Sequence, residues 1–542
     1  MGLVQRKNGG ESTGMILVRN IKSSRELSKE ELRSAAAKKL KLDEGKLSDT
    51  TIVKRALDAR KKEDIRWVYH AAFSVKGKEK NILDRCGGPD VAAYEPERYE
   101  IPEAGENMER PVVVGFGPAG MFAALVLARA GARPIVLERG CDVESRMKAV
   151  ELFRKGGPLD PENNVQFGEG GAGTFSDGKL GTGTHDRRIA WVMEQFAEHG
   201  AKESVKYDAK PHVGTDVLVH VVRNIREDVI RLGGEVRFST KLTGLRLKND
   251  ELCGVTVSHD GEESVIPCRS VILAVGHSAR DTFEMLLEKQ IPMERKPFSM
   301  GVRIEHLQSD TDKAQYGRER GELPPADYSL NVHLPDGSAA YTFCMCPGGV
   351  VFAAASEEGG VVTNGMSYSK RDGVNSNAAL LVTLHPEDFP GEGVLAGMEW
   401  QRTIERAAYS CGGKNYLAPA QKVGDFLRKV PSSGEGKVHP TYEPGVIWTD
   451  LHSVLPEEIT SVLENAIPAL GRKMRNFDDP DAVMTAPETR SSSPVRILRN
   501  ADCMSSVKGL YPCGEGAGYA EGITSAAVDG MRCAEAVLRD GR

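Results

Sequence analysis

The sequence predicts an α/β protein built on a parallel sheet whose strands come from both ends of the chain, with a second domain inserted between them. Three separated segments support this prediction, because each is a short apolar stretch followed by glycine: 112–117, 270–276 and 510–518. Short apolar runs bounded by turn residues are typical of strands buried on both faces of a parallel sheet. A small α/β module precedes these segments.

The stretch 111–140 has the features of a unit that holds a dinucleotide. A predicted strand at 112–114 is followed by three glycines with the spacing G-x-G-x-x-G. The first permits a tight turn, the second lets backbone approach a pyrophosphate, and the third lets the next helix pack closely. That helix, predicted from 121 to about 130, directs its N-terminal amides at the phosphates. The predicted contacts are Gly115, Gly117, Pro118, Ala119 and Gly120.

An acid follows the second predicted strand of this unit. Glu138 stands 18 positions after Gly120, where its carboxylate can accept hydrogen bonds from ribose hydroxyls, and Arg139 is predicted to contact the cofactor beside it. Because a carboxylate would repel a 2′-phosphate, NADP is disfavoured, and FAD and NAD remain. The alternative is an ordinary glycine-rich turn without a nucleotide.

The C-terminal segment distinguishes FAD from NAD. A predicted strand at 510–512 runs into glycines with one acid, and an amphipathic helix follows over 523–538. This resembles the closing motif of FAD-binding proteins with the glutathione-reductase type of fold, in which the carboxylate holds the ribityl chain or the pyrophosphate region. A helix start supplies the positive potential that an anionic reduced flavin needs. The implied contacts are Gly514, Glu515, Gly522 and Ile523.

The segment 270–276 agrees with FAD, because it is a predicted buried strand that ends in glycine. It resembles the Ala-Thr-Gly segment of the same fold, with Val275 in place of threonine, and it implies contacts from Ala274 and Gly276. Three separated segments therefore converge on FAD.

A glycine-rich loop follows the first unit, with seven glycines between positions 168 and 183. Bare backbone can approach a flat or anionic group, so we expect the loop to run along the flavin; a mobile surface loop is the alternative. Positions 173–179 approach a P-loop, but Leu180 stands where Ser or Thr is required, which argues against an ATP site. The predicted backbone contacts are Gly168, Gly170, Gly171 and Gly173, and the candidate ring or substrate contacts are Glu169, Asp177 and Lys179.

Composition narrows the class of protein. The chain of 542 residues is long enough for several domains, and its net charge of −6 argues against a nucleic-acid partner overall. Without a long apolar run or a signal-peptide start, we expect a cytoplasmic protein with no membrane partner. The ten cysteines are scattered, so we expect no structural disulfides.

A small module is predicted over 16–82, and we expect a ferredoxin-like arrangement for it. A strand at 16–21 precedes a helix that opens with the capping box Ser28-x-x-Glu31, and two further strands follow. The module has 18 Lys and Arg against 10 Asp and Glu, a net charge of +8. This indicates either a solvated or docking face, or a surface that binds RNA, an anion or a partner.

The remaining chain divides by its pattern of elements. We expect a disordered tail over 1–14. Residues 15–100 form the small module and, from about residue 81, a linker. The first part of a Rossmann-type FAD-binding domain follows over 101–290 and contains a small β-meander. An inserted α+β substrate domain is expected over 291–484, and 485–542 closes the FAD-binding domain. The inserted domain has predicted strands at 298–306, 329–334, 340–345, 350–355 and 380–384 and helices at 393–411 and 456–475.

Five motifs, taken together, resemble one bacterial family, that of FAD-dependent dehydrogenases or FAD-binding proteins of unassigned substrate. They are FGEGGAGTFSDGKL, CMCPGGVV, NGMSYSKRDGVNSN, SSSPVRILRN and YPCGEGAGYAEGITSAAVDGM. The resemblance covers essentially the whole chain and implies FAD and redox chemistry, but no substrate. Glu521 departs from it, since glycine is implied at this position near the flavin-facing helix.

Candidate catalytic residues are few, because a flavin accepts a hydride at N5 with little help. Cys344 and Cys346 form a C-x-C pair, interpreted as a redox pair, metal ligands or core residues; without a second cysteine pair nearby we predict no metal site. His277 contacts flavin or substrate, or is structural. Arg490 and Arg496 bind an anionic substrate, or form salt bridges.

The sequence thus predicts an FAD-dependent oxidoreductase that transfers hydride to or from a small organic substrate, anionic if the two arginines bind it. Because no second G-x-G-x-x-G unit with an acid behind it is present, either NAD(P)H visits the flavin transiently as donor or another reductant serves. The alternatives are a flavin-binding redox sensor or an RNA- or partner-associated factor that uses the basic module, and an NAD-binding protein without flavin, which the closing motif disfavours.

Overall fold

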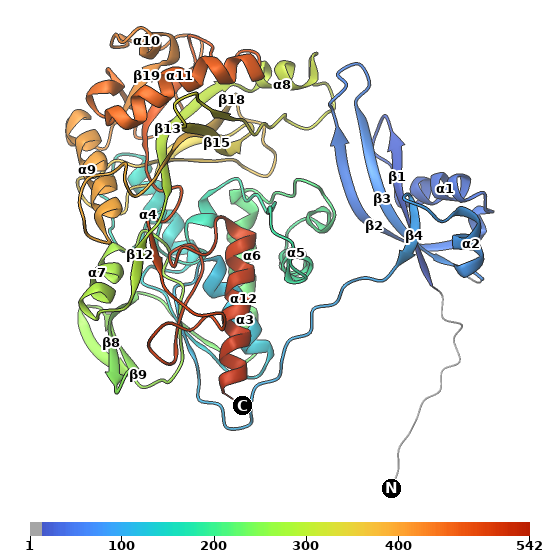
Figure 1. The fold of residues 1–542 in the computed structure, drawn as a ribbon, viewed down its shortest axis with the longest axis horizontal. Helices are drawn as coiled ribbons and strands as arrows, with labels where there is room; N and C mark the ends of the chain where they lie inside the picture. The colour runs from blue at the N-terminus through green and yellow to red at the C-terminus, as the bar shows by residue number, and fades with distance from the viewer. Residues whose placement is uncertain (1–13, 78, 542) are drawn as a thin grey trace. The chain divides into compact units, whose positions relative to one another are not determined.

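The computed structural model describes residues 14–77 and 79–541, which form two compact units (Figure 1). The smaller unit comprises the described residues up to Arg98 together with Glu203–Pro211, and the larger comprises Tyr99–Lys202 and the described residues from His212 onward. The tail expected over 1–14 lies, apart from Gly14, outside the described residues. None of the helices within these ranges is long and apolar enough to cross a membrane.

The smaller unit contains a four-stranded antiparallel sheet in the order β2-β3-β1-β4. Its elements follow one another as β-α-β-β-α-β, the ferredoxin-like connection, and residues of both helices share one apolar cluster with the sheet. The predicted Ser28–Glu31 capping box is present. The elements are β1 (Met15–Ser23), α1 (Lys29–Leu40), the 3₁₀ turn η1 (Glu44–Lys46), β2 (Leu47–Asp58), β3 (Arg66–Val75), α2 (Glu79–Cys86) and β4 (Val91–Tyr94).

Two expectations about this unit are wrong. The linker expected from about residue 81 contains most of α2 and all of β4, because Ile82 and Val91 complete the apolar cluster. The segment Glu203–Pro211, expected in the FAD-binding domain, belongs to the smaller unit. There Arg55 of β2 donates its backbone N–H to the Tyr207 carbonyl at 2.7 Å and its Nε–H to Asp208 at 2.7 Å.

The larger unit is organised around a five-stranded parallel sheet in the order β23-β11-β5-β6-β7. The edge strand β23 comes from near the C-terminus, so this part of the fold is discontinuous in sequence. Four of the strands are wholly buried, which explains their short apolar sequences. The sheet and its helices are β5 (Val112–Val114), α3 (Pro118–Arg129), β6 (Ile135–Leu137), α6 (Thr215–Arg231), β7 (Glu235–Arg237), β11 (Val271–Leu273), β23 (Leu510–Pro512) and α12 (Ile523–Asp540).

Helix α3 packs against both α12 and α6, so the first and last parts of the larger unit are joined by helices as well as by strands (Figure 1). The predicted β-meander is present between β7 and β11, with a third strand, β10, that the sequence did not indicate. The other elements of this region are α4 (Val143–Arg154), η2 (Ala172–Phe175), α5 (Arg188–Glu198), η3 (Glu203–Lys206, in the smaller unit), β8 (Thr240–Lys248), β9 (Glu251–His259), β10 (Glu262–Ile266) and α7 (Arg280–Glu288).

The inserted domain runs from β12 to β22, residues 293–497, and is called the C-terminal domain below. It contains a mixed seven-stranded sheet in the order β14-β15-β18-β13-β21-β19-β20. Its faces differ because side chains alternate along a strand. On β13, Met300, Val302 and Ile304 join an apolar cluster with α11, whereas Arg303 and Glu305 lie on the opposite, polar face. The elements are β12 (Met293–Arg295), β13 (Phe298–Leu307), α8 (Gln308–Tyr316), β14 (Asn331–His333), β15 (Ala339–Cys346), β16 (Val350–Ala353), β17 (Thr363–Met366), β18 (Asn375–Leu384), α9 (Ala396–Cys411), β19 (Ala418–Lys422), α10 (Val423–Leu427), β20 (Val446–Trp448), η4 (Leu451–Ser453), α11 (Glu457–Lys473), β21 (Val483–Glu488) and β22 (Val495–Ile497).

All five strands and both helices predicted in this domain are present, with shifted ends. The domain boundary expected at 484 is wrong, because β21 crosses it and pairs with β13 from Val483 to Glu488. The chain returns toward the parallel sheet through β22, which pairs with β12.

Candidate functional site

A groove lies at the carboxyl ends of four parallel strands, the edge at which open α/β sheets bind ligands. It contains about 1010 Å³ of empty space, part of it open to solvent, and its lining comes from the segments that follow β5, β6, β11 and β23 and from the glycine-rich loop. Most residues predicted to contact the cofactor line it: Gly115, Gly117, Pro118, Ala119, Glu138, Arg139, Gly171, Gly173, Ala274, Gly276, Glu515, Gly522 and Ile523.

The other four predicted contacts, Gly120, Gly168, Gly170 and Gly514, are not part of this lining. A Cβ on Gly120 would lie 1.9 Å from the Gly115 carbonyl oxygen, and one on Gly168 would lie 2.4 Å from Cδ of Arg146. Gly170 and Gly514 have positive φ angles of 85° and 75°. These glycines allow backbone segments to pack against each other behind the groove.

The turn after β5 leaves space and donors for an anion. Gly115 has a φ of 93°, and a Cβ there would lie 2.3 Å from the Ala274 carbonyl oxygen. Helix α3 begins at Pro118 after the N-cap Gly117, which lacks a side chain to cap the first turn. The free amides at this helix start therefore face the groove, as a pyrophosphate site requires.

Glu138 is fixed by backbone rather than by other side chains. Its Oε2 accepts a hydrogen bond from the Phe116 N–H at 2.8 Å, and its Oε1 accepts from the Gly140 and Gly168 N–H groups, each at 3.0 Å. The side chain is 4% exposed and lines the groove. Since each carboxylate oxygen has two lone pairs, acceptor capacity remains for ribose hydroxyls.

The glycine-rich loop touches the groove only with its first part. Gly171 and Gly173 line it, but the three acidic or basic side chains proposed as ring or substrate contacts do not, and each is held elsewhere. These contacts join the loop to α4, α6 and the C-terminal domain, which argues against the alternative of a mobile surface loop. The partners are the Val143 N–H and Arg226 for Glu169, Arg371 and Ser367 for Asp177, and the Met345 carbonyl for Lys179.

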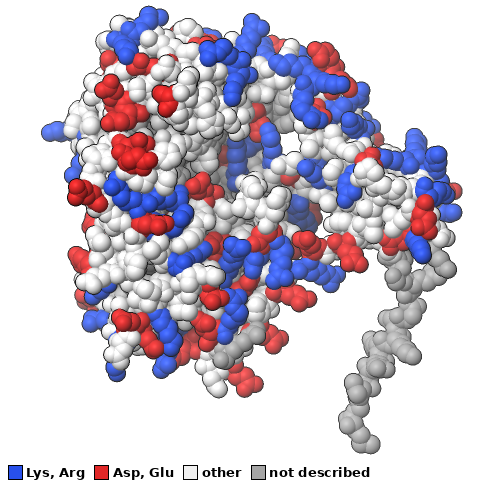
Figure 2. Space-filling view, in the orientation of Figure 1, with Lys and Arg blue, Asp and Glu red and all other residues white. Residues whose placement is uncertain are grey.

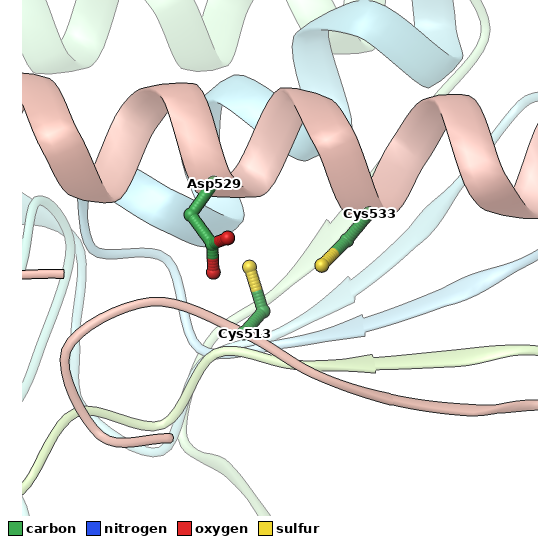
Figure 3. A group of neighbouring side chains, drawn as sticks. All are labelled: Cys513, Asp529 and Cys533. Atoms are coloured by element: carbon green, nitrogen blue, oxygen red, sulfur yellow. The ribbon is translucent and has the colours of Figure 1, made fainter. Parts of the chain in front are cut away.

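The start of the closing motif is held by a buried cluster that α12 and the residue after β23 form together. Cys513, Asp529 and Cys533 place three potential metal ligands within 4.8 Å of one another (Figure 3). Both oxygens of Asp529 accept hydrogen bonds from Arg499, at 2.6 and 2.9 Å, and one also accepts from the Gly514 N–H at 2.8 Å. Burial raises the pKa of both thiols, whereas metal binding needs thiolates. We interpret the cluster as the anchor of the closing motif.

The loop that Arg499 and Asp529 anchor brings Glu515 to His277. Nδ1 of His277 lies 3.0 Å from Oε1 of Glu515. His277 follows β11, is 9% exposed and lines the groove, and its Nε2 has no hydrogen-bond partner among the described residues. A buried polar atom without a partner in a groove lining indicates a missing ligand or water.

Comparisons with known proteins identify the family. The family model described as "FAD-dependent protein, C-terminal domain-like" matches residues 297–491, and a domain of unknown function matches residues 15–74. An uncharacterized protein of Clostridium beijerinckii is 47% identical over 529 residues, which cover 96% of this chain and 98% of that protein. This chain belongs to that family of FAD-dependent proteins.

More distant likenesses are partial. The aklavinone 12-hydroxylase DnrF of Streptomyces peucetius subsp. caesius is 31% identical over 182 residues, 30% of this chain and 35% of the hydroxylase. Among solved structures, the flavin-dependent brominase Bmp2 aligns with 12% identity over 80% of this chain and 79% of its own, with a TM-score of 0.37. A glycine oxidase of Bacillus cereus aligns with 13% identity over 80% and 95% of the two chains, with a TM-score of 0.34.

The groove of this FAD-dependent protein fits its cofactor. The glycines at 115 and 117 give the pyrophosphate an approach without Cβ atoms, and Glu138 offers acceptors for a ribose. At the other end, α12 begins after Gly522, which has a φ of 91° and supplies no capping side chain, and both Gly522 and Ile523 line the groove. A second free helix start is where a reduced flavin finds positive potential.

The two arginines proposed to bind an anionic substrate are engaged in ion pairs of this FAD-dependent protein. Arg490 donates two hydrogen bonds to Glu405, at 2.7 and 2.9 Å, and is 6% exposed. Arg280 binds the same carboxylate at 3.0 Å. Arg496 pairs with Glu294 at 3.2 Å, and neither Arg490 nor Arg496 lines the groove. The salt-bridge interpretation is therefore the one that the structure supports.

Cys344 and Cys346, the remaining weak candidates, lie on β15 of the C-terminal domain and do not line the groove. Several lining residues have no counterpart in the sequence prediction. The sequence could have indicated those that follow strands of the parallel sheet, because the residues after parallel strands gather at one edge of a sheet. The missed residues are Gln166, Phe167, Thr240, Lys241, Leu242, Ser278, Ala279 and Thr282.

Proposed function

We propose that this chain is an oxidoreductase in which bound FAD exchanges a hydride with a small organic substrate. One observation carries the proposal: α3 and α12 both begin on the same groove after N-cap glycines, Gly117 and Gly522, that supply no capping side chain. The first helix start suits a pyrophosphate, and the second suits the negative charge of a reduced flavin. A site for NAD alone would need only the first.

The chain's own groups orient the cofactor in this proposal. Three amides fix the orientation of the Glu138 carboxylate, so its one remaining lone pair, on Oε2, defines the ribose position. Glu515 holds Nδ1 of His277, which leaves Nε2 to make a hydrogen bond into the groove. FAD supplies the hydride chemistry when it is bound.

The substrate is proposed to bind beside the C-terminal domain. Gly173 and Ile523 lie in the groove lining, and Lys179, six residues after Gly173, donates a hydrogen bond to the Met345 carbonyl of β15. The glycine-rich loop, whose first part lines the groove, is thus joined to that domain farther along the loop. An anionic substrate loses its main support, because Arg490 and Arg496 already pair with carboxylates.

NAD(P)H is proposed as a transient electron donor. The described residues contain one sheet built wholly from parallel strands, and the glycine turns after its strands β5 and β11 both line the FAD groove. A nicotinamide would therefore approach the flavin without a second nucleotide-binding domain of this kind.

The test is the absorption spectrum of the purified, FAD-loaded chain, followed by anaerobic addition of NADH or NADPH. If one of the two donors bleaches the flavin absorption band at about 450 nm, a reductase half-reaction is supported. A yellow protein that neither donor reduces overturns NAD(P)H as donor and moves the search to substrates that reduce flavin. A protein that cannot bind FAD overturns the proposal itself.

A second candidate function uses the smaller unit. Lys22 and Lys54 are exposed beside a shallow hollow on its sheet that His70 and Arg60 also line. Figure 2 shows lysine and arginine side chains over the surface of this unit. We propose that the surface binds an anionic partner, RNA being one such class. Reversing Lys22 and Lys54 to Glu should abolish retention on an RNA or heparin column without changing the flavin spectrum; unchanged retention would exclude this surface.

A further inference from the structure

Cys344 and Cys346 lie at an irregularity of β15. The strand pairs with β18 through Phe343↔Ala379 and then Cys346↔Asn377, so one extra residue is inserted on β15. Cys344 has a φ of 43°, in the left-handed region that costs energy for a residue with a Cβ. Such strained positions persist where the surroundings hold them, and they gather at functional sites.

Cations hold this bulge from two elements. Arg303 of β13 is wholly buried, and its Nη2 donates to the Cys344 carbonyl at 2.6 Å and to Sγ of Cys346 at 3.4 Å. Lys179 of the glycine-rich loop donates to the carbonyl of Met345, between the two cysteines. The two thiols thus lie in a positive environment, which stabilises a thiolate.

The carboxylates near the bulge offset only part of this charge. Glu488 of β21 lies 3.5 Å from Nη1 of Arg303, and Asp177 is neutralised by Arg371. A hydrogen bond from the Cys346 thiol lowers the pKa of Cys344 to about 6, and Arg303 and Lys179 act in the same direction against burial. Burial raises the pKa of Cys346. These contacts favour a thiolate on Cys344 while Cys346 keeps its proton.

Polar atoms next to the pair lack partners. Nη1 of Arg303, Nδ2 of Asn377, Oγ1 of Thr485 and Oε2 of Glu488 are all buried, and none has a hydrogen-bond partner among the described residues. These atoms lie on β18, β13 and β21, the first, second and third strands from β15 in the sheet, and Asn377 and Glu488 both contact Arg303. Unsatisfied buried groups at one place point to a ligand, a water or a changing charge there.

The other interpretations of the pair explain less. Two inert core cysteines would not require a left-handed residue, and Cys344 is partly exposed. A metal ion would have to bind beside the guanidinium of Arg303, which repels cations, and the structure brings no third metal ligand to this pair within the described residues.

We propose that Cys344 and Cys346 form a thiol–disulfide exchange site that takes low-molecular-weight disulfides as its oxidant. The Cys344 thiolate attacks one sulfur of the disulfide, a mixed disulfide forms, and one small thiolate leaves. Cys346 loses its proton and attacks Sγ of Cys344, and the second small thiolate leaves. Starting from one thiolate and one thiol, the chain loses two electrons and one proton, and the small disulfide becomes two small thiolates, one of which can take up that proton.

The test uses the full-length, FAD-loaded chain and dithionitrobenzoate as the disulfide, with peptide mass mapping of the product. At pH 6 only about 0.3% of an ordinary thiol is thiolate, and the lowered pKa of Cys344 keeps a much larger share of it ionised, while the lower nucleophilicity of an acidic thiolate costs about tenfold. We therefore expect Cys344 to react about tenfold faster than the exposed Cys253. The expected products of the fast phase are two thionitrobenzoates per chain and a Cys344–Cys346 disulfide, and Cys253 reacts later.

Matched variants separate the two roles. Cys346→Ser should release one thionitrobenzoate and keep the mixed disulfide on Cys344, whereas Cys344→Ser should remove the fast phase. Lys179→Met, which leaves Arg303 in place, should slow the reaction at pH 6 by about two- to threefold through the loss of one nearby charge.

Two outcomes overturn the proposal. If Cys344 stays unmodified in the folded chain while Cys253 reacts, the bulge does not present a reactive thiol. If Cys346→Ser releases the second thionitrobenzoate as fast as the natural chain, Cys346 does not resolve the mixed disulfide. Because neither readout uses flavin turnover, failure here leaves the proposed function untouched.

Discussion

Nδ1 of His277 lies 3.0 Å from Oε1 of Glu515, although the whole C-terminal domain separates the two residues in sequence. The contact joins the residue after β11 to the loop after β23, and these strands are neighbours at the edge of the parallel sheet. It places one unsatisfied ring nitrogen in the groove.

Removing this ring should weaken FAD binding. In His277→Ala we expect a Kd for FAD about three- to tenfold higher, which corresponds to one hydrogen bond of about 0.5–1.5 kcal/mol. This Kd is measured by titrating the apoprotein with FAD and monitoring the flavin fluorescence. His333→Ala is the matched control, since His333 is exposed on β14. Equal affinity of both variants would show that the ring does not contact the cofactor.

A methyl group at position 120 should destabilise the larger unit. Its Cβ would lie 1.9 Å from the Gly115 carbonyl, so either α3 or the glycine turn must shift. We expect Gly120→Ala to lower the free energy of unfolding by about 1–3 kcal/mol, with loss of FAD retention. Gly181→Ala is the control, because a Cβ there has no neighbour within 4 Å. Thermal unfolding that is the same for both variants would contradict the packing role.

The pH dependence of stability should change in Glu169→Gln. Burial raises the pKa of Glu169 to about 7, while the unfolded chain releases this proton near the ordinary value of 4.5. Between these values the folded state binds more protons, so this residue makes stability fall as pH rises from about 4.5 to 7. In the Gln variant this fall in the free energy of unfolding should disappear, which urea unfolding at pH 5 and at pH 7.5 measures. Glu227→Gln, at an exposed site, should keep it.

The ion pair in the smaller unit should protect Glu203–Pro211 from proteolysis. Arg55 contacts Asp208 through two nitrogens, at 2.7 and 3.0 Å. Without this pair we expect tryptic cleavage after Lys206 to be about tenfold faster in Asp208→Ala, equivalent to about 1.4 kcal/mol of local opening. Glu26→Ala removes the more exposed partner of Arg55 and should change the rate far less. No difference between the variants would show that backbone pairing alone holds the segment.

Most of the groove could be predicted from the sequence, because glycine turns after short apolar strands impose local conformations. Gly115, Gly276 and Gly522 all have positive φ and line it. The position of charged side chains could not be predicted. Asp177 looked like a ligand contact within its glycine loop, yet its partner Arg371 lies 194 residues away. Likewise, Arg490 was a candidate substrate contact, but it pairs with Glu405 of α9, which lies 85 residues away in the sequence.

The predicted boundaries of the linker and of the smaller unit were wrong where contacts between distant residues override the local sequence pattern. The prolines and acids near residue 90 suggested a linker, but four residues of β4 suffice to pair with β1. Likewise the segment Glu203–Pro211 carries no sequence feature that marks it as a partner of β2. Such pairings depend on complementary surfaces far apart in the chain, and a local pattern does not encode them.

The late position of β23 and α12 also sets an order for biosynthesis. A ribosome makes β5, β6, β7 and β11 first, and β11 then has an open edge until residues 510–512 emerge. The wall formed by Glu515, Gly522 and Ile523 appears only after that. The nascent chain must therefore keep an unfinished sheet from pairing wrongly while the C-terminal domain is translated, and the groove that holds the cofactor is complete only once residues 510–526 have been made.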